Sequence, residues 1–265
     1  MSVAGPVPRL QATACMTYFR SLTLDNLRAA LYSLRRQNMD MLAEVVVVDN
    51  NTEDSQPEIA AAINEQNFPV PTRLLSFKHG DPTKTHSWST NVAVREAKTP
   101  WVFFTRADYL LADGLLARSV QQAAVRGYGW HGFVTGDCYH LHVTVLDCDA
   151  AGWRVNGGAV SLKTLPGAAA EYTLIDTGVY LIRRDAFEKV GAMNEQLTVW
   201  GHAQTEFQFR LHKAGVEMIR IPELLYFHPY HGAPRDLAAA TAQLAEYGVD
   251  IKKLWERYDG EHIYR

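Results

Sequence analysis

The chain has 265 residues, of which 47% are hydrophobic and 21% are charged. This balance is typical of a packed globular protein and too apolar for a disordered one. The formal net charge of -3 gives no basic excess for a nucleic-acid surface. Three cysteines without a Cys-x-x-Cys pair disfavour a disulfide framework or a zinc ribbon, and they suit a reducing cytoplasm.

The N-terminal segment has no basic stretch followed by an apolar core, so a signal peptide is not expected. No run approaches about 18 apolar residues, so a transmembrane helix is not expected either. We therefore expect a cytoplasmic protein, for which peripheral association with a membrane stays open.

Strand and helix patterns alternate through the first half of the chain. Leu24, Leu27, Leu31 and Leu34 follow the spacing of one helical face. The run Val45–Val48 is typical of a central parallel strand that is buried on both faces. Strands are expected at 10–17, 44–49, 73–77 and 101–105, with helices at 23–37, 57–66 and 86–97. This order predicts an α/β fold with an open, mostly parallel sheet flanked by helices.

The second half of the chain is less regular. Period-two alternation over His140–Leu146 predicts a strand within an antiparallel region at 130–165. Helices are expected at 113–126, 185–190 and 205–214, strands at 178–182 and 217–221, a further segment at 224–231, and two helices beyond Pro234. A single domain with an appended helical region fits this pattern better than two independent domains.

Polar residues follow three of the expected parallel strands, at Thr17–Arg20, Asp49–Asn51 and Arg106–Asp108. Open α/β sheets bind their ligands beyond the carboxyl ends of the strands. These three segments are therefore the first candidates for a binding site.

Six segments of the chain occur in the order and spacing of a known family. They are Ala12–Arg20, Glu44–Asp54, Ser87–Ala93, Trp101–Asp108, Gly178–Gly191 and Trp200–His228. Residues 10–231 thereby resemble the family 2 nucleotide-sugar glycosyltransferases, which have the GT-A fold. The resemblance implies a GT-A domain at 1–231, with a nucleotide-binding half at about 10–108 and an acceptor-side half at 109–231. A small antiparallel sheet and a C-terminal helical extension at 232–265 complete the expected architecture.

The resemblance also implies an activity. We expect inverting transfer of a hexosyl or N-acetylhexosaminyl group from a nucleoside-diphosphate sugar, with a UDP-sugar as the expected donor. The acceptor is a glycan, a lipid-linked molecule or a small molecule. The C-terminal helices are a candidate homodimer surface.

The donor nucleotide is expected at the strand ends. A carboxylate at Asp49 can accept the uracil N3–H, with a simple Asx turn as the alternative. Thr17 and Arg20 flank the first strand end, within reach of base and phosphate. The resemblance adds donor-binding candidates at Tyr18, Asn51, Asn91, Arg106, Ala107 and Asp108, and substrate-binding candidates at Trp200 and Gly201.

The family holds Mn²⁺ or Mg²⁺ with an Asp-x-Asp motif, whose first position is Arg106 here and whose last is Asp108. The resemblance implies a divalent ion held by Asp108 and His228, with His231 in reserve, because Mn²⁺ accepts mixed nitrogen and oxygen ligands. The competing hypothesis is that Arg106 contacts the diphosphate and replaces the metal charge.

Relatives carry a Glu-Asp pair as the catalytic base, where this chain has Ala203 and Gln204. Three other residues are candidate bases, in the order Glu206, Asp176 and His202. A structural Glu206 that pairs with Arg210 four residues later is the alternative for the first.

Other candidates carry less weight. His140 and His142 share a strand face without a third ligand nearby, which favours an acceptor-facing or exposed strand. Trp200, Trp153 and Tyr230 can stack on a sugar or pack in the core. The eroded motifs also allow a second function, that of a non-catalytic sugar-nucleotide or glycan-binding relative or partner subunit. A nucleotidyltransferase is disfavoured because residues 16–21 contain no glycine.

Overall fold

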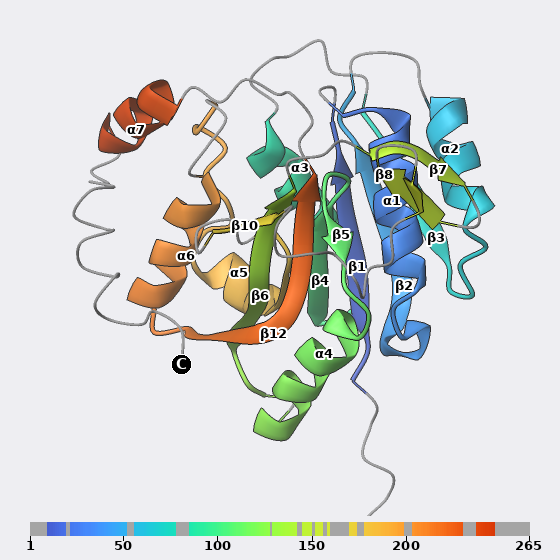
Figure 1. Ribbon diagram of the computed structural model, residues 1–265. Coiled ribbons are helices and arrows are strands. Elements are labelled where there is room, and N and C mark those ends of the chain that lie inside the picture. The colour runs from blue at the N-terminus through green and yellow to red at the C-terminus, as the bar shows by residue number, and fades with distance from the viewer. Residues whose placement is uncertain are drawn as a thin grey trace, which may run out of the picture.

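The computed structural model has a central sheet with helices packed on both of its faces (Figure 1). The structure describes residues 10–19, 22–51, 56–77, 85–127, 129–141, 145–149, 152–155, 158–159, 170–173, 178–198, 203–229 and 237–246. The expected α/β class, with a mostly parallel sheet flanked by helices, is confirmed.

The strands are β1 (Ala12–Tyr18), β2 (Leu42–Asp49), β3 (Thr72–Ser76), β4 (Trp101–Arg106), β5 (Leu110–Leu111), β6 (Gly132–Leu141), β7 (Val145–Asp149), β8 (Gly152–Val155), β9 (Gly158–Ala159), β10 (Ala170–Thr173), β11 (Tyr180–Arg183) and β12 (Glu217–Pro229). The helices are α1 (Leu24–Arg35), η1 (Met39–Met41), α2 (Gln56–Glu65), α3 (His86–Glu96), α4 (Leu115–Arg126), α5 (Arg184–Lys189), α6 (Ala203–Lys213) and α7 (Leu237–Glu246). None of the helices in this described part of the chain is long and apolar enough to cross a bilayer.

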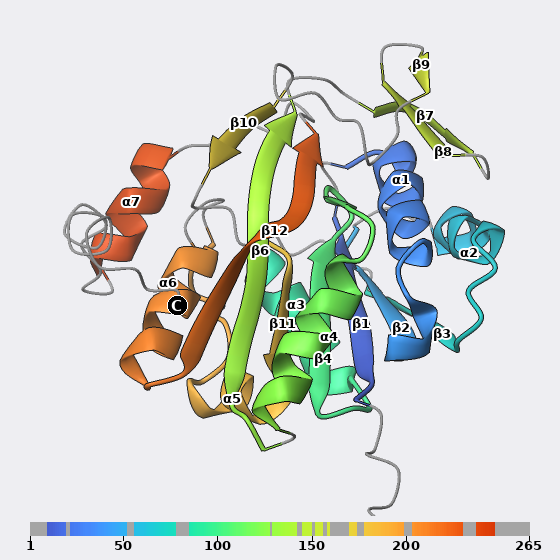
Figure 2. The ribbon, with the colours of Figure 1, turned by 60° about the horizontal axis from the view of Figure 1, so that its bottom comes forward.

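The main sheet has the strand order β3-β2-β1-β4-β11-β6-β12-β5, and β10 pairs with β6. Strands β1 to β4 are mutually parallel, whereas β11 runs antiparallel to both of its neighbours, β4 and β6. Strands β7, β8 and β9 form a separate antiparallel sheet near α1 (Figure 2). The chain leaves β1 toward β2 and β3 and returns to the opposite side of β1 as β4. The carboxyl ends of β1 and β4 therefore meet at the topological switch point of the sheet.

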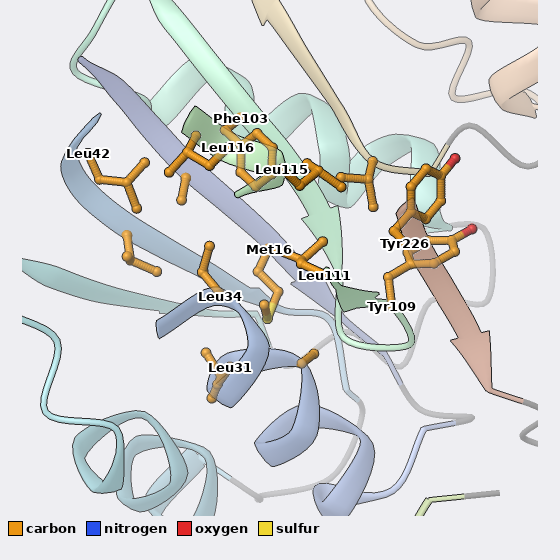
Figure 3. Packing of buried hydrophobic residues seen from close by; sticks show 14 of the residues in the cluster. Met16, Leu31, Leu34, Leu42, Phe103, Tyr109, Leu111, Leu115, Leu116 and Tyr226 are labelled. Carbon is orange, nitrogen blue, oxygen red and sulfur yellow. The ribbon is translucent and has the colours of Figure 1, made fainter. Parts of the chain in front are cut away.

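Two hydrophobic cores cover the two faces of the sheet. One contains residues of α1, α2 and α4, and the other contains residues of α3, α5 and α6. The Val45–Val48 run alternates between them, as expected for a strand buried on both sides. Figure 3 shows Leu31 and Leu34 of α1 facing Met16 of β1 across the first core.

Helix α1 begins where its sequence provides a capping box. The Thr23 side chain accepts a hydrogen bond from the Asn26 N–H, and the Asn26 side chain accepts one from the Thr23 N–H. The expected leucine face is then buried at Leu27, Leu31 and Leu34.

Two boundaries differ from the expectation. A strand was expected only at 217–221, but β12 continues into the segment that follows it and runs from Glu217 to Pro229, with a register shift between Arg220 and Leu225. Such an irregularity lets one strand pass through a Pro-containing stretch without losing its pairing. Of the strand expected at 140–146, residues 140–141 belong to β6 and residues 145–146 to β7, and residues 142–144 lie outside the described part of the chain. Of the expected C-terminal helices the structure describes α7, and residues 247–265 lie outside its described part.

The buried carboxylate of Glu44 joins neighbouring strands at the end of the sheet opposite the switch point. Glu44 of β2 is 2% exposed and accepts hydrogen bonds from Thr13 Oγ1 (3.2 Å), Arg73 Nε (3.0 Å) and the Lys98 N–H (3.0 Å). Burial alone would raise the pKa of Glu44, but the bonds from Arg73 and the Lys98 N–H hold that pKa below its ordinary value.

We expect the substitution Glu44→Gln to lower the free energy of unfolding by about 1–3 kcal/mol at neutral pH, because it leaves buried donors poorly paired. A pKa that is lower in the folded chain stabilises the fold above the ordinary glutamate pKa, and this contribution is lost as the pH falls through the folded value. The free energies of unfolding of the wild type and the Gln variant, measured by urea titration, should therefore converge as the pH is lowered through the acid range. Glu188→Gln, at an exposed residue of α5, is the control; equal losses in both variants would contradict the assignment.

Candidate functional site

The switch point brings three strand ends together. Thr17 of β1 is in register with Arg106 of β4 on one side and with Val48 of β2 on the other. The Ala107 N–H donates to the Thr17 carbonyl at 2.9 Å and so continues the β1–β4 pairing one residue past β4. The expected candidates Thr17, Tyr18, Asp49, Arg106 and Ala107 therefore lie at one edge of the sheet.

Asp49 is the last residue of β2 and is 1% exposed. One carboxylate oxygen accepts the Asn51 N–H at 3.0 Å, which is the Asx turn named as the alternative. The other accepts the Ser76 hydroxyl at 2.8 Å. Burial raises the pKa of Asp49, although the bonds from Ser76 and Asn51 oppose the rise. These contacts fix the direction of the carboxylate.

A second cluster of polar side chains forms around Arg106. Its Nε and Nη2 each donate to one oxygen of Asp108 at 2.9 Å, and Nη2 also donates to the Tyr109 hydroxyl at 2.6 Å. His228 Nε2 lies 3.2 Å from the Asp108 Oδ2 atom. Arg106 is 6%, Asp108 1% and His228 3% exposed. This Arg106 cluster, made of Arg106, Asp108, Tyr109 and His228, joins the end of β4 to β12.

Tyr109 supports the cluster from the core side. The Arg106 guanidinium carbon lies 4.4 Å from the centre of its ring, and the His228 ring centre lies 4.9 Å away. Tyr109 packs edge-on against Tyr226 at the end of the first core, where Figure 3 shows the two rings side by side. Gly178 allows this packing, because a Cβ atom at that position would overlap the Tyr109 ring.

Three buried hydroxyls in the described part of the chain have no hydrogen-bond partner there. They belong to Thr17 of β1, Ser87 in the first turn of α3 and Tyr180 of β11. Tyr180 is stacked between Phe104 and Phe133, and burial raises the pKa of its hydroxyl. A buried polar group without a partner is uncommon, and such groups often face a ligand or a bound water.

The comparisons with known families fall on the same elements. Residues 13–131 match the family model of glycosyl transferase family 2. Residues 163–232 match the model described as the N-terminal domain of galactosyltransferase. The two matched segments together make this chain similar to glycosyltransferases. No curated protein matches the sequence.

Solved glycosyltransferase structures share the fold, which is the GT-A fold expected from the sequence. The mannosyltransferase PcManGT from Pyrobaculum calidifontis, in complex with GDP-Man and Mn²⁺, has a TM-score of 0.60 and 17% identity over 91% of this chain and 63% of its own. GalNAc-T7 with UDP, GalNAc and Mn²⁺ has a TM-score of 0.58 and 15% identity over 84% of this chain and 44% of its own. S. aureus TarS has a TM-score of 0.56 and 15% identity over 90% of this chain and 43% of its own.

This chain spans between 43% and 63% of the length of the three structures. At these low identities the likeness shows the fold alone.

Two of these structures contain Mn²⁺, but the described residues around Asp108 do not form a donor set that fits a divalent ion. Both oxygens of Asp108 are bonded to the Arg106 guanidinium, and His228 contacts one of them. The described residues contain no group of three or more His, Cys, Asp or Glu side chains placed around a metal position. A cation at Asp108 would lie beside a guanidinium, with one carboxylate and one imidazole as its protein ligands.

Two other expected site residues, Glu206 and Asn91, form hydrogen bonds to other residues of the protein. Glu206 accepts two hydrogen bonds from Arg210, at 2.6 and 2.9 Å, and Arg210 also donates to the Val190 carbonyl. This is the structural pairing named as the alternative for Glu206. The Asn91 side chain bonds the Met193 N–H and carbonyl and the Glu195 carboxylate, so it fastens α3 to the loop after α5.

Several expected residues cannot be placed. Arg20, Asp176, His202, Trp200, Gly201, His142, Tyr230 and His231 lie outside the described residues. His140 lies in β6 and Trp153 in β8, and only the backbone of these two residues is described. Their roles stay predictions.

Ser76 and Tyr109 were not among the residues expected from the sequence. Ser76 ends β3, so its position at a strand end is the same signal that points to Asp49. Tyr109 has no comparable signal, because its role depends on contacts with Gly178 and Tyr226, which are distant in sequence.

We expect Gly178→Ala to destabilise the protein by about 1–3 kcal/mol, because the new methyl group must displace the buried Tyr109 ring. Urea unfolding measures the change. Gly129→Ala is the matched control, because a Cβ atom there meets nothing within 4 Å. Equal stability of the two variants would show that Tyr109 does not depend on Gly178.

Proposed function

We propose that the protein is an inverting glycosyltransferase that moves a hexosyl or N-acetylhexosaminyl group from a UDP-sugar to an acceptor. The observation that supports this most is the convergence of Asp49 and the Arg106 cluster on one edge of a family 2 fold. The acceptor is a glycan, a lipid-linked molecule or a small molecule. We propose a cytoplasmic location, with peripheral membrane contact where the acceptor is lipid-linked.

We assign the nucleobase to Asp49. Its carboxylate is buried and is oriented by Ser76 and the Asn51 N–H, so it presents a fixed acceptor rather than a mobile one. An ionised carboxylate accepts hydrogen bonds but donates none, which suits the N3–H of uracil. The diphosphate then lies toward the ends of β1 and β4.

In the proposed reaction, the bond from the anomeric carbon to the diphosphate oxygen breaks, and its electron pair leaves with UDP. The acceptor oxygen forms the new bond and gives its proton to a general base. The Glu206 carboxylate is held by Arg210, which favours a structural role for it. We therefore propose Asp176 as the base, with His202 as the next candidate.

The second candidate function is a sugar-nucleotide-binding protein without transferase activity. The absence of the family's Glu-Asp pair at Ala203 and Gln204 supports it. This function predicts UDP binding without turnover, whereas a transferase also releases UDP from a sugar nucleotide.

We expect Asp49→Asn to weaken UDP binding by about tenfold to a hundredfold, because it removes a charged acceptor from the base. Isothermal titration calorimetry measures the dissociation constant. Burial raises the pKa of Asp49, so lowering the pH should protonate it and weaken UDP binding sooner than for an ordinary aspartate. Binding to the Asn variant should lack this pH dependence.

Asp113→Asn is the control, since Asp113 pairs with Arg36 outside the site. GDP, ADP and CDP are measured beside UDP. Tighter binding of another nucleotide would replace UDP in the proposal, and no binding of any of the four would contradict it.

We expect Glu206→Gln to reduce thermal stability and to keep UDP release within about tenfold of the wild type, because its role is to pair with Arg210. Asp176→Asn should lower UDP release by about a hundredfold or more without loss of stability. Release of UDP from a panel of UDP-sugars and a melting curve test both variants. A stable Glu206→Gln variant without turnover would instead identify Glu206 as the base.

A further inference from the structure

The position that the family reserves for a metal-binding aspartate holds a buried arginine, which lies at the end of β4. We infer that Arg106 binds the donor diphosphate in place of a divalent metal ion, so that this protein binds its nucleotide without metal. This inference rests on the proposed function, because it concerns the diphosphate of the same donor.

The net charge of Arg106 with Asp108 equals that of two aspartates with one bound divalent ion. An aspartate at position 106 would carry -1 and the arginine carries +1, so the exchange adds two positive charges. A divalent ion adds the same two charges. Asp108 with Arg106 therefore has the net charge that two aspartates have with one bound ion.

The contacts of Arg106 orient its guanidinium. Asp108 binds the Nε–Nη2 edge through both oxygens, the Tyr109 hydroxyl accepts from Nη2, and the Tyr109 ring lies beneath the guanidinium carbon. A guanidinium carries five N–H donors in one plane, so one edge can hold a carboxylate while another meets phosphate oxygens. Asp108 and Tyr109 act here as positioning residues.

His228 strengthens this arrangement from the other side of the carboxylate. Its Nε2 atom lies 3.2 Å from the Asp108 Oδ2 atom, and its ring packs on Tyr109. In a metal site, Asp108 and His228 would both direct lone pairs at the ion. Here they contact each other, and the carboxylate serves the guanidinium.

Thr17 supplies a second donor at the same place. Its hydroxyl is fully buried, has no hydrogen-bond partner among the described residues, and belongs to the residue of β1 that is in register with Arg106. A hydroxyl can donate to a phosphate oxygen. A bound diphosphate would therefore satisfy a polar group that the protein alone leaves unsatisfied.

The test measures UDP binding to the full chain by calorimetry, once in EDTA and once in Mn²⁺. We expect dissociation constants within about twofold of each other. Electron paramagnetic resonance of Mn²⁺ should show no ion bound by the protein alone. The variant Arg106→Gln should bind UDP about tenfold to a hundredfold more weakly in EDTA, and Arg106→Lys should recover only part of the loss because it lacks the planar fork.

Arg126→Gln is the matched control. Arg126 is the last residue of α4 and pairs with Glu217 at the start of β12. This pair lies at the end of the sheet opposite the Arg106 cluster, so UDP binding should not change. A further variant, Arg106→Asp, restores the two-aspartate motif and should make UDP binding depend on Mn²⁺. Melting curves establish that each variant is folded.

The outcomes separate the inference from the function on which it rests. Binding of UDP that requires Mn²⁺ in the wild type would overturn the role of Arg106 and leave the glycosyltransferase proposal intact. Equal binding by wild type and a folded Arg106→Gln variant would also overturn it. Failure of UDP, GDP, ADP and CDP to bind with or without Mn²⁺ would overturn both.

Discussion

A buried guanidinium must be neutralised where it lies, and this requirement organises one end of the central sheet. Arg106 is 6% exposed, so leaving its charge without a partner would carry a large desolvation penalty. Asp108 supplies the charge, and His228 of β12 contacts the same carboxylate. The His228 contact thereby links the end of β4 to β12, a strand that lies far away in the sequence. Tyr109 can lie beneath the pair because Gly178 presents no side chain to its ring.

The strand order explains why the Arg106 cluster lies at the carboxyl ends of the parallel strands, where ligands are expected. Strands β1 and β4 are neighbours, yet the chain between them passes through β2 and β3 on the far side of β1. The carboxyl ends of β1 and β4 therefore lie side by side without a direct connection between them, at the position where open α/β sheets bind ligands. Asp49 lies on β2, two strands away from Arg106 on β4, which at the usual strand spacing is a separation of about 10 Å. A base at Asp49 and a diphosphate at Arg106 therefore suit one extended nucleotide.

The parts of the fold that could be predicted from the sequence are those governed by local patterns. The continuous Val45–Val48 run is typical of a strand buried on both faces, the leucine spacing of α1 follows the helical period of 3.6 residues, and both were placed correctly. The strand-end rule likewise selected Asp49 and Arg106. The pairing of Glu206 with Arg210 was recognisable as an i, i+4 contact.

Long-range contacts could not be predicted in this way. Asn91 bonds residues more than 100 positions away, and Tyr109 depends on Gly178 and Tyr226. No local period carries this information. The side-chain direction of Arg106 is a similar case, because it depends on a turn that brings Asp108 back toward the strand.

A fixed guanidinium also differs physically from a bound ion: it is oriented before the ligand arrives and does not dissociate with the product. Its single charge is spread over a plane, so hydroxyls such as that of Thr17 must complete the contacts that an ion would make through its coordination shell.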